Sequence, residues 1–280
     1  MEAALCDQRL PVAEPRPRSV ALAYARDIFA ARYFWWHLAM SDLRSRWRRS
    51  YLGILWSILQ PLGITILISI VFSRLLNASF LDYAPYVLSG IIFWEFFAST
   101  VSGGSLAFVQ NEPYIKQCRH PLAIYTLRAV LANLVVTMVA SLALVIVVLV
   151  LKPETLGWAW LAWFLALPIL LFTAWPLATA LAYVSVRFRD VPYALGLAMQ
   201  TLWFISPVYF DVKLFRSAGL DGLVDYNPIY HLLELTRAPF LRGEWPSLAN
   251  YGVCLATIAG LATLAIVLGR RMERRVLFYL

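Results

Sequence analysis

The sequence contains little charge and few cysteines. Only 14% of its 280 residues are charged and 61% are hydrophobic, whereas a soluble domain is about 25% charged and roughly half apolar. Such an apolar excess cannot be buried within one or two domains of this length, which excludes a disordered chain and a basic soluble domain that binds nucleic acid. The three cysteines are odd in number and form no C-x-x-C pair, which excludes a disulfide scaffold. An integral membrane protein remains.

The motifs of an ATP-binding or catalytic chain are also missing. None of the three lysines follows a glycine, so the sequence contains no phosphate-binding loop of the form G-x-x-x-x-G-K-[ST]. The three histidines stand in separate segments without the spacing of metal ligands. Glu95 is the only carboxylate in a run long enough to span a membrane, whereas proton relays string several such groups together. We therefore expect no enzyme activity, no metal site and no cofactor on this chain.

Long runs without charge, or with Glu95 alone, indicate the transmembrane helices. A bilayer core needs about 20 consecutive apolar residues for each spanning helix. The runs lie near residues 52–74, 84–107, 122–150, 158–185, 191–210 and 246–269. We therefore expect an all-α integral membrane protein with six transmembrane helices, in a domain that covers residues 52–270.

The distribution of positive charge predicts the orientation of these helices. With the N-terminus in the cytoplasm, 18 of the 24 lysines and arginines fall in cytoplasmic segments and six in external ones. Because cytoplasmic loops carry the excess of Lys and Arg in membrane proteins, both termini are expected in the cytoplasm, as tails over residues 1–32 and 271–280. The net charge of +8 is thus a signal of topology.

Residues 33–51 predict an amphipathic helix before the first span. Its apolar face is formed by Trp36, Met40, Leu43, Trp47 and Tyr51. Asp42 and Arg46 are spaced i, i+4 for a weak ion pair on the polar face. Such a helix lies in the membrane interface, either as an anchor that orients the first span or as a docking surface for a cytoplasmic partner.

The external segment 211–245 is too long for a structureless connection. Asn227 can cap a helix that starts at Pro228 and ends near Gly243. We expect re-entrant or interfacial helices here, before the last span. In that span, Gly252, Ala256 and Gly260 form a face of small residues that permits close helix approach. We expect this face to pack against other helices of the same subunit. A contact between two copies of the chain is the alternative.

Four segments of the chain resemble one family of membrane proteins. They are RRSYLGILWSILQP at 48–61, QNEPYIKQCRHP at 110–121, RFRD at 187–190, and NP at 227–228. In this order and at these places they resemble the ABC-2 permeases that export polysaccharides, the membrane subunits of O-antigen, capsule and teichoic-acid exporters. The resemblance runs from about residue 33 to the end of the chain.

The resemblance implies a permease subunit that moves a lipid-linked polysaccharide across the bacterial cytoplasmic (inner) membrane. The implied partners are a second copy of the chain, membrane lipids, and a separate ABC ATPase that would bind ATP and Mg²⁺. Two alternatives stay open. The first is a permease of the same fold for a drug or a simple lipid, and the second is a membrane scaffold of a glycan-assembly complex that transports nothing.

The cytoplasmic segments offer candidate contacts to such an ATPase. Pro113 and Pro121 bracket about two turns that predict a short coupling helix, with Glu112 favourable at its N-terminus. The candidate coupling residues are Asp42, Arg46, Glu112, Tyr114, Lys116, Arg119, Arg187, Arg189 and Asp190. The alternatives are a plain basic loop around Lys116 and, at 187–190, a snorkelling anchor with a helix cap.

Two spans combine the aromatic faces and polar groups that bind sugars. The candidate residues of a substrate path are Trp94, Glu95, Phe97, Gln200, Trp203, Phe204 and Tyr209. Aromatic belts at both membrane interfaces are the alternative for the aromatic members, because such belts occur in most membrane proteins. An interhelical hydrogen bond is the alternative for Glu95.

Overall fold

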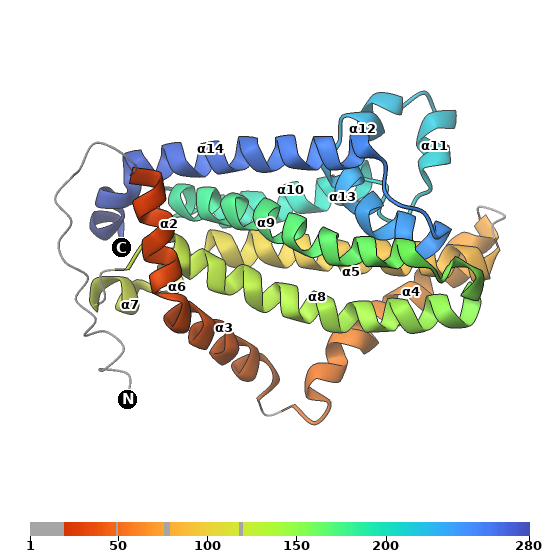
Figure 1. Cartoon of the computed structure of the whole chain (residues 1–280), viewed down its shortest axis with the longest axis horizontal. Helices are drawn as coiled ribbons and strands as arrows, with labels where there is room; N and C mark the ends of the chain where they lie inside the picture. Colours follow the sequence, from red (N-terminus) through yellow and green to blue (C-terminus); the bar gives the residue numbers. More distant parts are fainter. Residues whose placement is uncertain (1–19, 49, 76–78, 118–119) are drawn as a thin grey trace.

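A computed structural model describes residues 20–48, 50–75, 79–117 and 120–280, which fold into an elongated bundle of helices (Figure 1). The described residues contain no β-strand. Five long helices run along the bundle: α4 (Trp56–Leu75), α5 (Phe80–Ser105), α8 (Ala123–Leu151), α9 (Ala162–Arg187) and α14 (Leu248–Tyr279). The all-α prediction is therefore confirmed.

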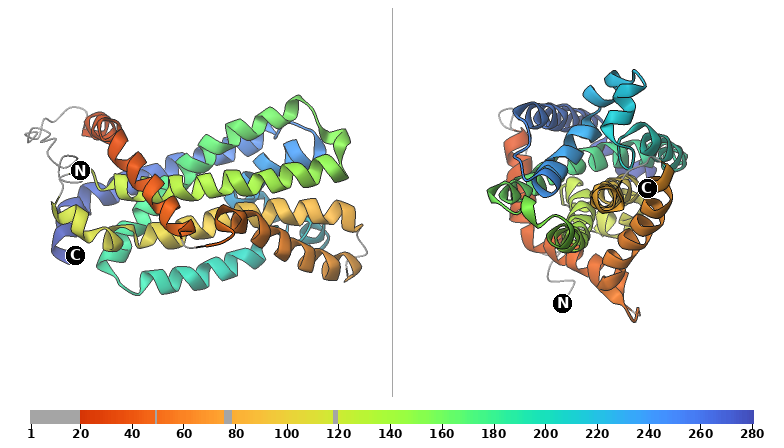
Figure 2. Two further views of the ribbon diagram at one scale, coloured as in Figure 1. Left: turned by 90° about the horizontal axis from the view of Figure 1, so that it is seen from below. Right: turned by 90° about the vertical axis from the view of Figure 1, so that its right-hand side faces the viewer.

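Short helices gather at the two ends of the bundle (Figures 1 and 2). The end that we call the α7 end holds α2 (Val20–Ala30), α6 (Ala107–Gln110), α7 (Glu112–Gln117) and the C-terminus. The opposite end, the α11 end, holds η2 (Pro153–Thr155), η3 (Trp158–Leu161), α11 (Val212–Ser217), α12 (Asp221–Asp225) and α13 (Pro228–Arg237).

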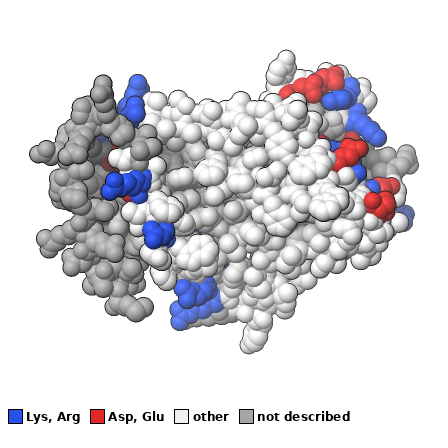
Figure 3. All heavy atoms as spheres, in the orientation of Figure 1, with Lys and Arg blue, Asp and Glu red and all other residues white. Residues whose placement is uncertain are grey.

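Within the described residues, five helical segments are long and apolar enough to cross a membrane. They are Gly53–Leu75, Phe80–Ser105, Ala123–Leu151, Trp158–Arg187 and Leu248–Glu273. In Figure 3, a broad band of uncharged side chains separates the charged side chains at the two ends of the bundle. The band is the part of the surface that a hydrocarbon core would surround.

The expected span at 191–210 is the exception. Its helix, α10 (Val191–Ile205), has 15 residues, which cover about 22 Å at 1.5 Å per residue, short of the roughly 30 Å of a bilayer core. The helix stops because Ser206, which precedes Pro207, has an extended backbone with ψ of 145°, the conformation that a following proline favours. Six full spans are therefore not confirmed.

Helix α5 is buried over most of its length and packs against α4, α8 and α9. Its contact with α9 is close because Gly104 faces Ala178: a Cβ atom at Gly104 would lie 2.5 Å from the Cβ of Ala178. The neighbouring Gly103 has no such neighbour, since a Cβ there would meet nothing within 4 Å. One of two adjacent glycines therefore sets the distance between two central helices.

The two terminal helices meet at the α7 end. Tyr24 on α2 donates a hydrogen bond of 3.1 Å to Glu273 Oε1 on α14 and accepts one of 3.3 Å from the backbone of Ala123. Helix α14 continues to Tyr279, through the range expected to be a C-terminal tail. Most of the expected N-terminal tail, residues 1–19, lies outside the described residues.

The amphipathic helix expected at 33–51 corresponds to α3 (Arg32–Trp47), which leaves Tyr51 beyond the helix. The 3₁₀ turn η1 (Gly53–Leu55) then leads into α4. The buried side chains of α3 are Ala39 and Leu43, and the partly buried Phe34 and Trp35 also pack against the bundle.

The predicted helix at Pro228 is confirmed. Asn227 Oδ1 accepts a hydrogen bond of 2.9 Å from the backbone N–H of Ile229, and a π-helical turn, η4 (Ala238–Arg242), follows α13. Gly243 ends this segment with a positive φ of 67°, a conformation that favours glycine. Nearly all of α13 is buried, so it packs into the end of the bundle instead of lying on its surface.

Candidate functional site

Helix α7 presents a small charged surface at its end of the bundle. Lys116 Nζ lies 2.5 Å from Glu112 Oε1, in an i, i+4 ion pair, and Tyr114 is exposed beside them. Arg119, the fourth candidate coupling residue of this segment, lies outside the described residues. The short helix predicted between Pro113 and Pro121 is confirmed in position.

One buried side chain anchors α7 to the long helices. Ile115 is 7% exposed and belongs to an apolar cluster at the α7 end. The buried members of this cluster are Phe108, Ile115, Leu122, Tyr125, Ala182, Tyr183, Val186 and Val276. These residues come from α6, α7, α8, α9 and α14, together with Leu122 just before α8, so Ile115 connects α7 to three long helices.

The turn at 187–190 is attached to the C-terminal helix. Arg187 Nη1 donates a hydrogen bond of 2.7 Å to the hydroxyl of Tyr279, and its guanidinium lies 5.7 Å from the centre of that ring. Arg189 and Asp190 are exposed. The side chain of Asp190 makes no capping hydrogen bond to α10, so the alternative of a side-chain helix cap is wrong.

Asp42 pairs with α8 and not with its neighbour on α3. Its Oδ1 lies 3.0 Å from Arg128 Nη2, and the expected pair with Arg46 is wrong. The reason is that Asp42 lies on the side of α3 that faces α8, within reach of Arg128. Burial there raises the pKa of the Asp42 carboxyl, and the positive charge of Arg128 opposes that rise. Arg46 instead donates a hydrogen bond of 3.4 Å to Asn133 Oδ1.

Two adjoining cavities lie between α3 and the long helices, and together we call them the α3 vestibule. The first, of about 170 Å³, is bordered by α3, α4, α5 and α8, and the second, of about 380 Å³, by α3, α5, α6 and α8. Arg46, Ser99 and Asn133 line both. Figure 1 shows how α3 and α4 splay away from the bundle on this side.

The lining of the α3 vestibule is rich in polar groups. Its charged members are Asp42, Arg46, Glu95 and Arg128. Its neutral polar members are Ser50, Ser57, Gln60, Ser99, Gln110, Asn111, Tyr125, Asn133 and Thr137. Of the residues predicted to form a substrate path, Glu95 lines this vestibule, beside the predicted coupling residues Asp42 and Arg46.

The predicted aromatic path residues lie elsewhere, in the core and on the surface of α10. Trp94 and Phe97 are buried, and the ring of Trp94 meets Trp203 edge-on at 5.2 Å. Trp203 in turn stacks on Tyr209 at 5.8 Å. Gln200 and Phe204, by contrast, are exposed on the outer face of α10.

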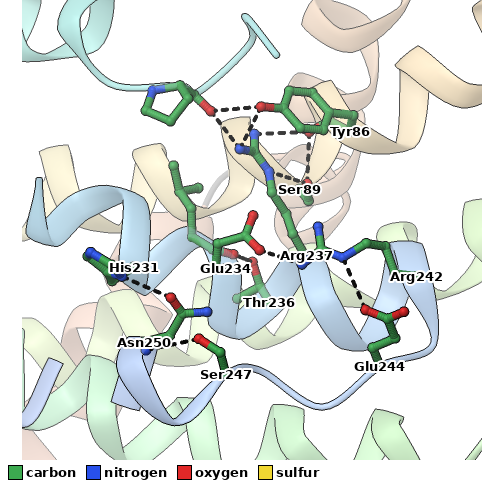
Figure 4. Close-up of polar contacts among 12 residues, drawn as sticks. Tyr86, Ser89, His231, Glu234, Thr236, Arg237, Arg242, Glu244, Ser247 and Asn250 are labelled. Atoms are coloured by element: carbon green, nitrogen blue, oxygen red, sulfur yellow. Dashed lines mark hydrogen bonds and ion pairs between the residues drawn. The ribbon is translucent and has the colours of Figure 1, made fainter. Parts of the chain in front are cut away.

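A second polar site, which the sequence analysis missed, surrounds Arg237 at the α11 end (Figure 4). Its guanidinium is fully buried and donates hydrogen bonds to the carbonyl oxygens of Pro207 (2.6 Å) and Val208 (2.5 Å). It also donates to Tyr86 and to Ser89, and it lies 3.8 Å from the centre of the Tyr86 ring. A single arginine within the apolar run of 228–241 was the available signal.

This site satisfies the backbone beyond the end of α10. The carbonyl groups of residues 207–210 follow the end of the helix and therefore have no intrahelical partners, and α5 supplies two further donors. Tyr83 donates a hydrogen bond of 2.7 Å to the carbonyl of Tyr209, and Tyr86 one of 2.8 Å to that of Phe210. Four consecutive carbonyls are thus bound by side chains of α5 and α13.

No cluster of three or more His, Cys, Asp or Glu residues that could hold a metal ion occurs among the described residues. The binding groups of the α3 vestibule are arginines, carboxylates, amides and hydroxyls. Such groups bind and position a polar ligand, and they contain no nucleophile paired with a general base.

Comparisons with known proteins agree with the architecture. Residues 33–241 match the family described as ABC-2 type transporter. The O-antigen export system permease protein RfbA of Myxococcus xanthus is 25% identical over 231 residues, which cover 79% of this chain and 85% of that protein. The protein of the same name from Klebsiella pneumoniae is 22% identical over 227 residues, with coverages of 79% and 86%.

A relative with a different name is similar over an even larger part of the chain. The polysialic acid transport protein KpsM of Escherichia coli is 22% identical over 241 residues, which cover 85% of this chain and 91% of that protein. The similarity to all three relatives thus extends over most of both sequences, and the family match alone covers well over half of the chain. This chain therefore belongs to the ABC-2 type transporter family, as a multi-pass membrane permease.

Proposed function

We propose that this chain is the membrane subunit of an exporter that moves a lipid-linked polysaccharide across the bacterial cytoplasmic (inner) membrane. The observation that carries the proposal is the similarity to relatives named for O-antigen export and polysialic acid transport, which extends over most of each chain. Five membrane-crossing helices and a polar vestibule beside them support it.

The α7 end faces the cytoplasm in this proposal, with both termini on that side. The support is the distribution of charge, since 18 of the 24 lysines and arginines fall in the sequence segments predicted to be cytoplasmic, and the described parts of these segments include α2, α7 and the end of α14 (Figure 1). The α11 end then faces outward, and α11, α12 and α13 lie at the external side of the permease.

A separate ABC ATPase binds ATP and Mg²⁺ and docks on the α7 end. The support is the geometry of α7, where Tyr114 and the Glu112–Lys116 pair are exposed while Ile115 is held in the cluster of the long helices. Closure of the ATPase would push α7 as a rigid element and shift α8, α9 and α14. The permease itself carries out no covalent chemistry.

Two copies of the chain pair in the membrane, each with one ATPase. A side-chain Cβ at Gly252 or Gly260 would meet nothing within 4 Å, and Ala256 is exposed between them. The small-residue face of α14 is therefore not used within the subunit, contrary to expectation. Helix α10 also has no buried residue, which leaves two helices with faces that a second copy could cover.

Reversing the charge of α7 tests the ATPase interaction. Lys116→Glu combined with Arg119→Glu should reduce co-purification of the ATPase and polysaccharide export by roughly tenfold or more, because two positive charges of the proposed coupling segment become negative. Export is measured as surface polysaccharide in cells, and association by pull-down of the tagged permease.

The matched control is Lys213→Glu, which reverses an exposed lysine on α11 at the opposite end of the bundle. It should leave ATPase association unchanged. If the double variant at α7 also retains full association and export, the ATPase docks elsewhere and the proposed role of α7 is wrong.

A further inference from the structure

The α3 vestibule holds an arginine and a carboxylate that form no ion pair with any described residue. Arg46 has five N–H donors, and within the described part of the chain its one hydrogen bond is the 3.4 Å contact to Asn133 Oδ1. Glu95 faces the same cavity and lies fifteen residues after Phe80, about 22 Å along α5. Asp42 and Arg128, by contrast, are paired at 3.0 Å.

Neutral hydrogen-bonding groups surround these two charges. Gln60, Ser99, Asn133 and Thr137 line the smaller cavity. Tyr125 lines the larger one; this residue is fully buried, and its hydroxyl has no hydrogen-bond partner among the described residues. Because the Tyr125 hydroxyl is itself buried, the groups offered to a ligand are the polar side chains that line the smaller cavity.

The mouth of the smaller cavity borders an apolar surface. Trp47 and Trp56 are part of its lining, and Trp56 is 53% exposed. Along α4, the neighbouring outward side chains include Leu59, Ile66 and Leu67, all exposed. Because this surface belongs to a membrane-crossing helix, a ligand reaches the vestibule most directly from the lipid.

These features together specify the chemistry of the ligand. An arginine fork binds phosphate oxygens by paired, charge-assisted hydrogen bonds. A carboxylate and neutral amides bind hydroxyl groups, and an indole offers a flat apolar face to a sugar ring. A membrane lipid that carries a phosphate followed by a sugar contains each of these groups, and the two adjoining cavities, of about 170 and 380 Å³, offer room for such a head.

We propose that the α3 vestibule binds the phosphate–sugar junction of a lipid-linked glycan, with the phosphate at Arg46 and the hydroxyls of the first sugar at Glu95 and Asn133. The lipid chain lies along the exposed apolar side of α4. The inference rests on the proposed function, and it assigns recognition of the lipid-proximal end of the substrate to a site within one subunit.

Binding to the full-length chain in lipid nanodiscs tests the site. The probe is a synthetic polyprenyl diphosphate that carries one hexose, and its retention is measured by native mass spectrometry. Three comparison ligands separate the contributions: polyprenyl diphosphate without sugar, phosphatidylglycerol, and an uncharged alkyl hexoside. The glycosylated diphosphate should bind about tenfold more tightly than each of the others, because only it engages both Arg46 and Glu95.

Variants of the two unpaired charges make the test specific. Arg46→Gln should weaken binding of the probe by about tenfold or more, and Arg46→Lys should weaken it less, because lysine keeps the charge but not the fork. Glu95→Ala, which removes the hydrogen-bonding group altogether, should remove the preference for the glycosylated probe over polyprenyl diphosphate. The matched control is Arg44→Gln, an exposed arginine on the same helix whose Nε donates to the carbonyl of Met40, which should bind as the unmodified chain does.

Two results would overturn the inference. Equal retention of phosphatidylglycerol and of the glycosylated probe would make the vestibule an ordinary phospholipid site, and an Arg46→Gln variant with full binding would place the ligand elsewhere. Failure of the proposed function is seen separately, in polysaccharide export by cells. The charge-reversed α7 variant addresses that function and should leave probe binding unchanged.

Discussion

Replacing Arg237 by methionine is expected to lower the stability of the folded chain by on the order of 3 kcal/mol or more. The change keeps the volume of the side chain roughly constant but removes every donor that now binds the carbonyls of Pro207, Val208 and Tyr86. These carbonyls lie beside a buried side chain, where water cannot replace the lost hydrogen bonds at no cost. The segment after α10 would lose its attachment to α5 and α13.

The measurement is thermal unfolding of the purified chain in detergent, followed by intrinsic tryptophan fluorescence. The Arg237→Lys variant should be destabilised less, because the single ammonium nitrogen of lysine can keep some of these hydrogen bonds. It lacks the broad guanidinium group that now reaches all of the acceptors. Tyr83→Phe, which removes only the bond to the carbonyl of Tyr209, should cost about 1 kcal/mol. Methionine at 237 with unchanged stability would contradict the role given to this arginine.

A neighbouring glycine supports the same reading of this site. A Cβ atom at Gly90 would lie 2.0 Å from the carbonyl oxygen of Val208 and 2.7 Å from Arg237 Nη2. Both distances are too short for real contacts, so α5 must carry a glycine where the segment after α10 crosses it. The close contact between the backbones at Gly90 and Val208 and the hydrogen bonds of Arg237 thus belong to the same site.

The second large effect is expected at the contact between α5 and α9. Gly104→Ala should destabilise the chain by about 1–3 kcal/mol, because the added methyl group would lie 2.5 Å from the Cβ of Ala178 and 3.0 Å from its Cα. Backbone cannot move aside as a flexible side chain can, so the two helices must separate and lose packing along their length.

Gly103→Ala is the matched control, one residue away on the same helix. A Cβ there meets nothing within 4 Å, and alanine favours a helix over glycine by about 1 kcal/mol. This variant should be as stable as the unmodified chain or more stable. The comparison uses thermal unfolding of both proteins in the same detergent, and equal behaviour of the two variants would mean that the helices do not approach as described.

The sequence was sufficient where a local rule decides the structure. Asn227 followed by Pro228 predicted the start of α13, because capping and the fixed φ of proline act within a few residues. Five of the six predicted spans, four built on runs without charge and one on a run with Glu95 alone, correspond to helices that are long and apolar enough to cross a membrane, since the hydrocarbon thickness sets their length. The segment around Lys116 predicted the short helix α7 between its prolines.

The sequence misled where charge alone was counted. The run from Asp190 to Asp211 is long enough for a span, yet Pro207 restricts the residue before it and α10 ends at Ile205. Pro207 was visible in the sequence, and its effect on the backbone of Ser206 decides where the helix ends, although the run without charge continues beyond it. The bent segment that results is the one that Arg237 binds.

Side-chain partners could not be predicted because they join residues far apart in the chain. Asp42 and Arg46 have the spacing of a helical ion pair, but Asp42 contacts Arg128, which is 86 residues away. Trp94 and Trp203 are separated by more than a hundred residues and meet edge-on in the core. The spacing of apolar residues along one helix does not predict which face of that helix contacts which face of another.

The sequence by itself determined the class of this protein: an all-helical membrane protein, positively charged at one end, whose segments resemble the ABC-2 permeases. Hydrophobic length and charge decide these properties, and both are read residue by residue. Only the tertiary structure decided that Gly104 and not Gly103 is critical, that Arg237 holds the end of α10, and that Arg46 and Glu95 face one cavity. These depend on how helices pack, and close packing is a property of the whole fold.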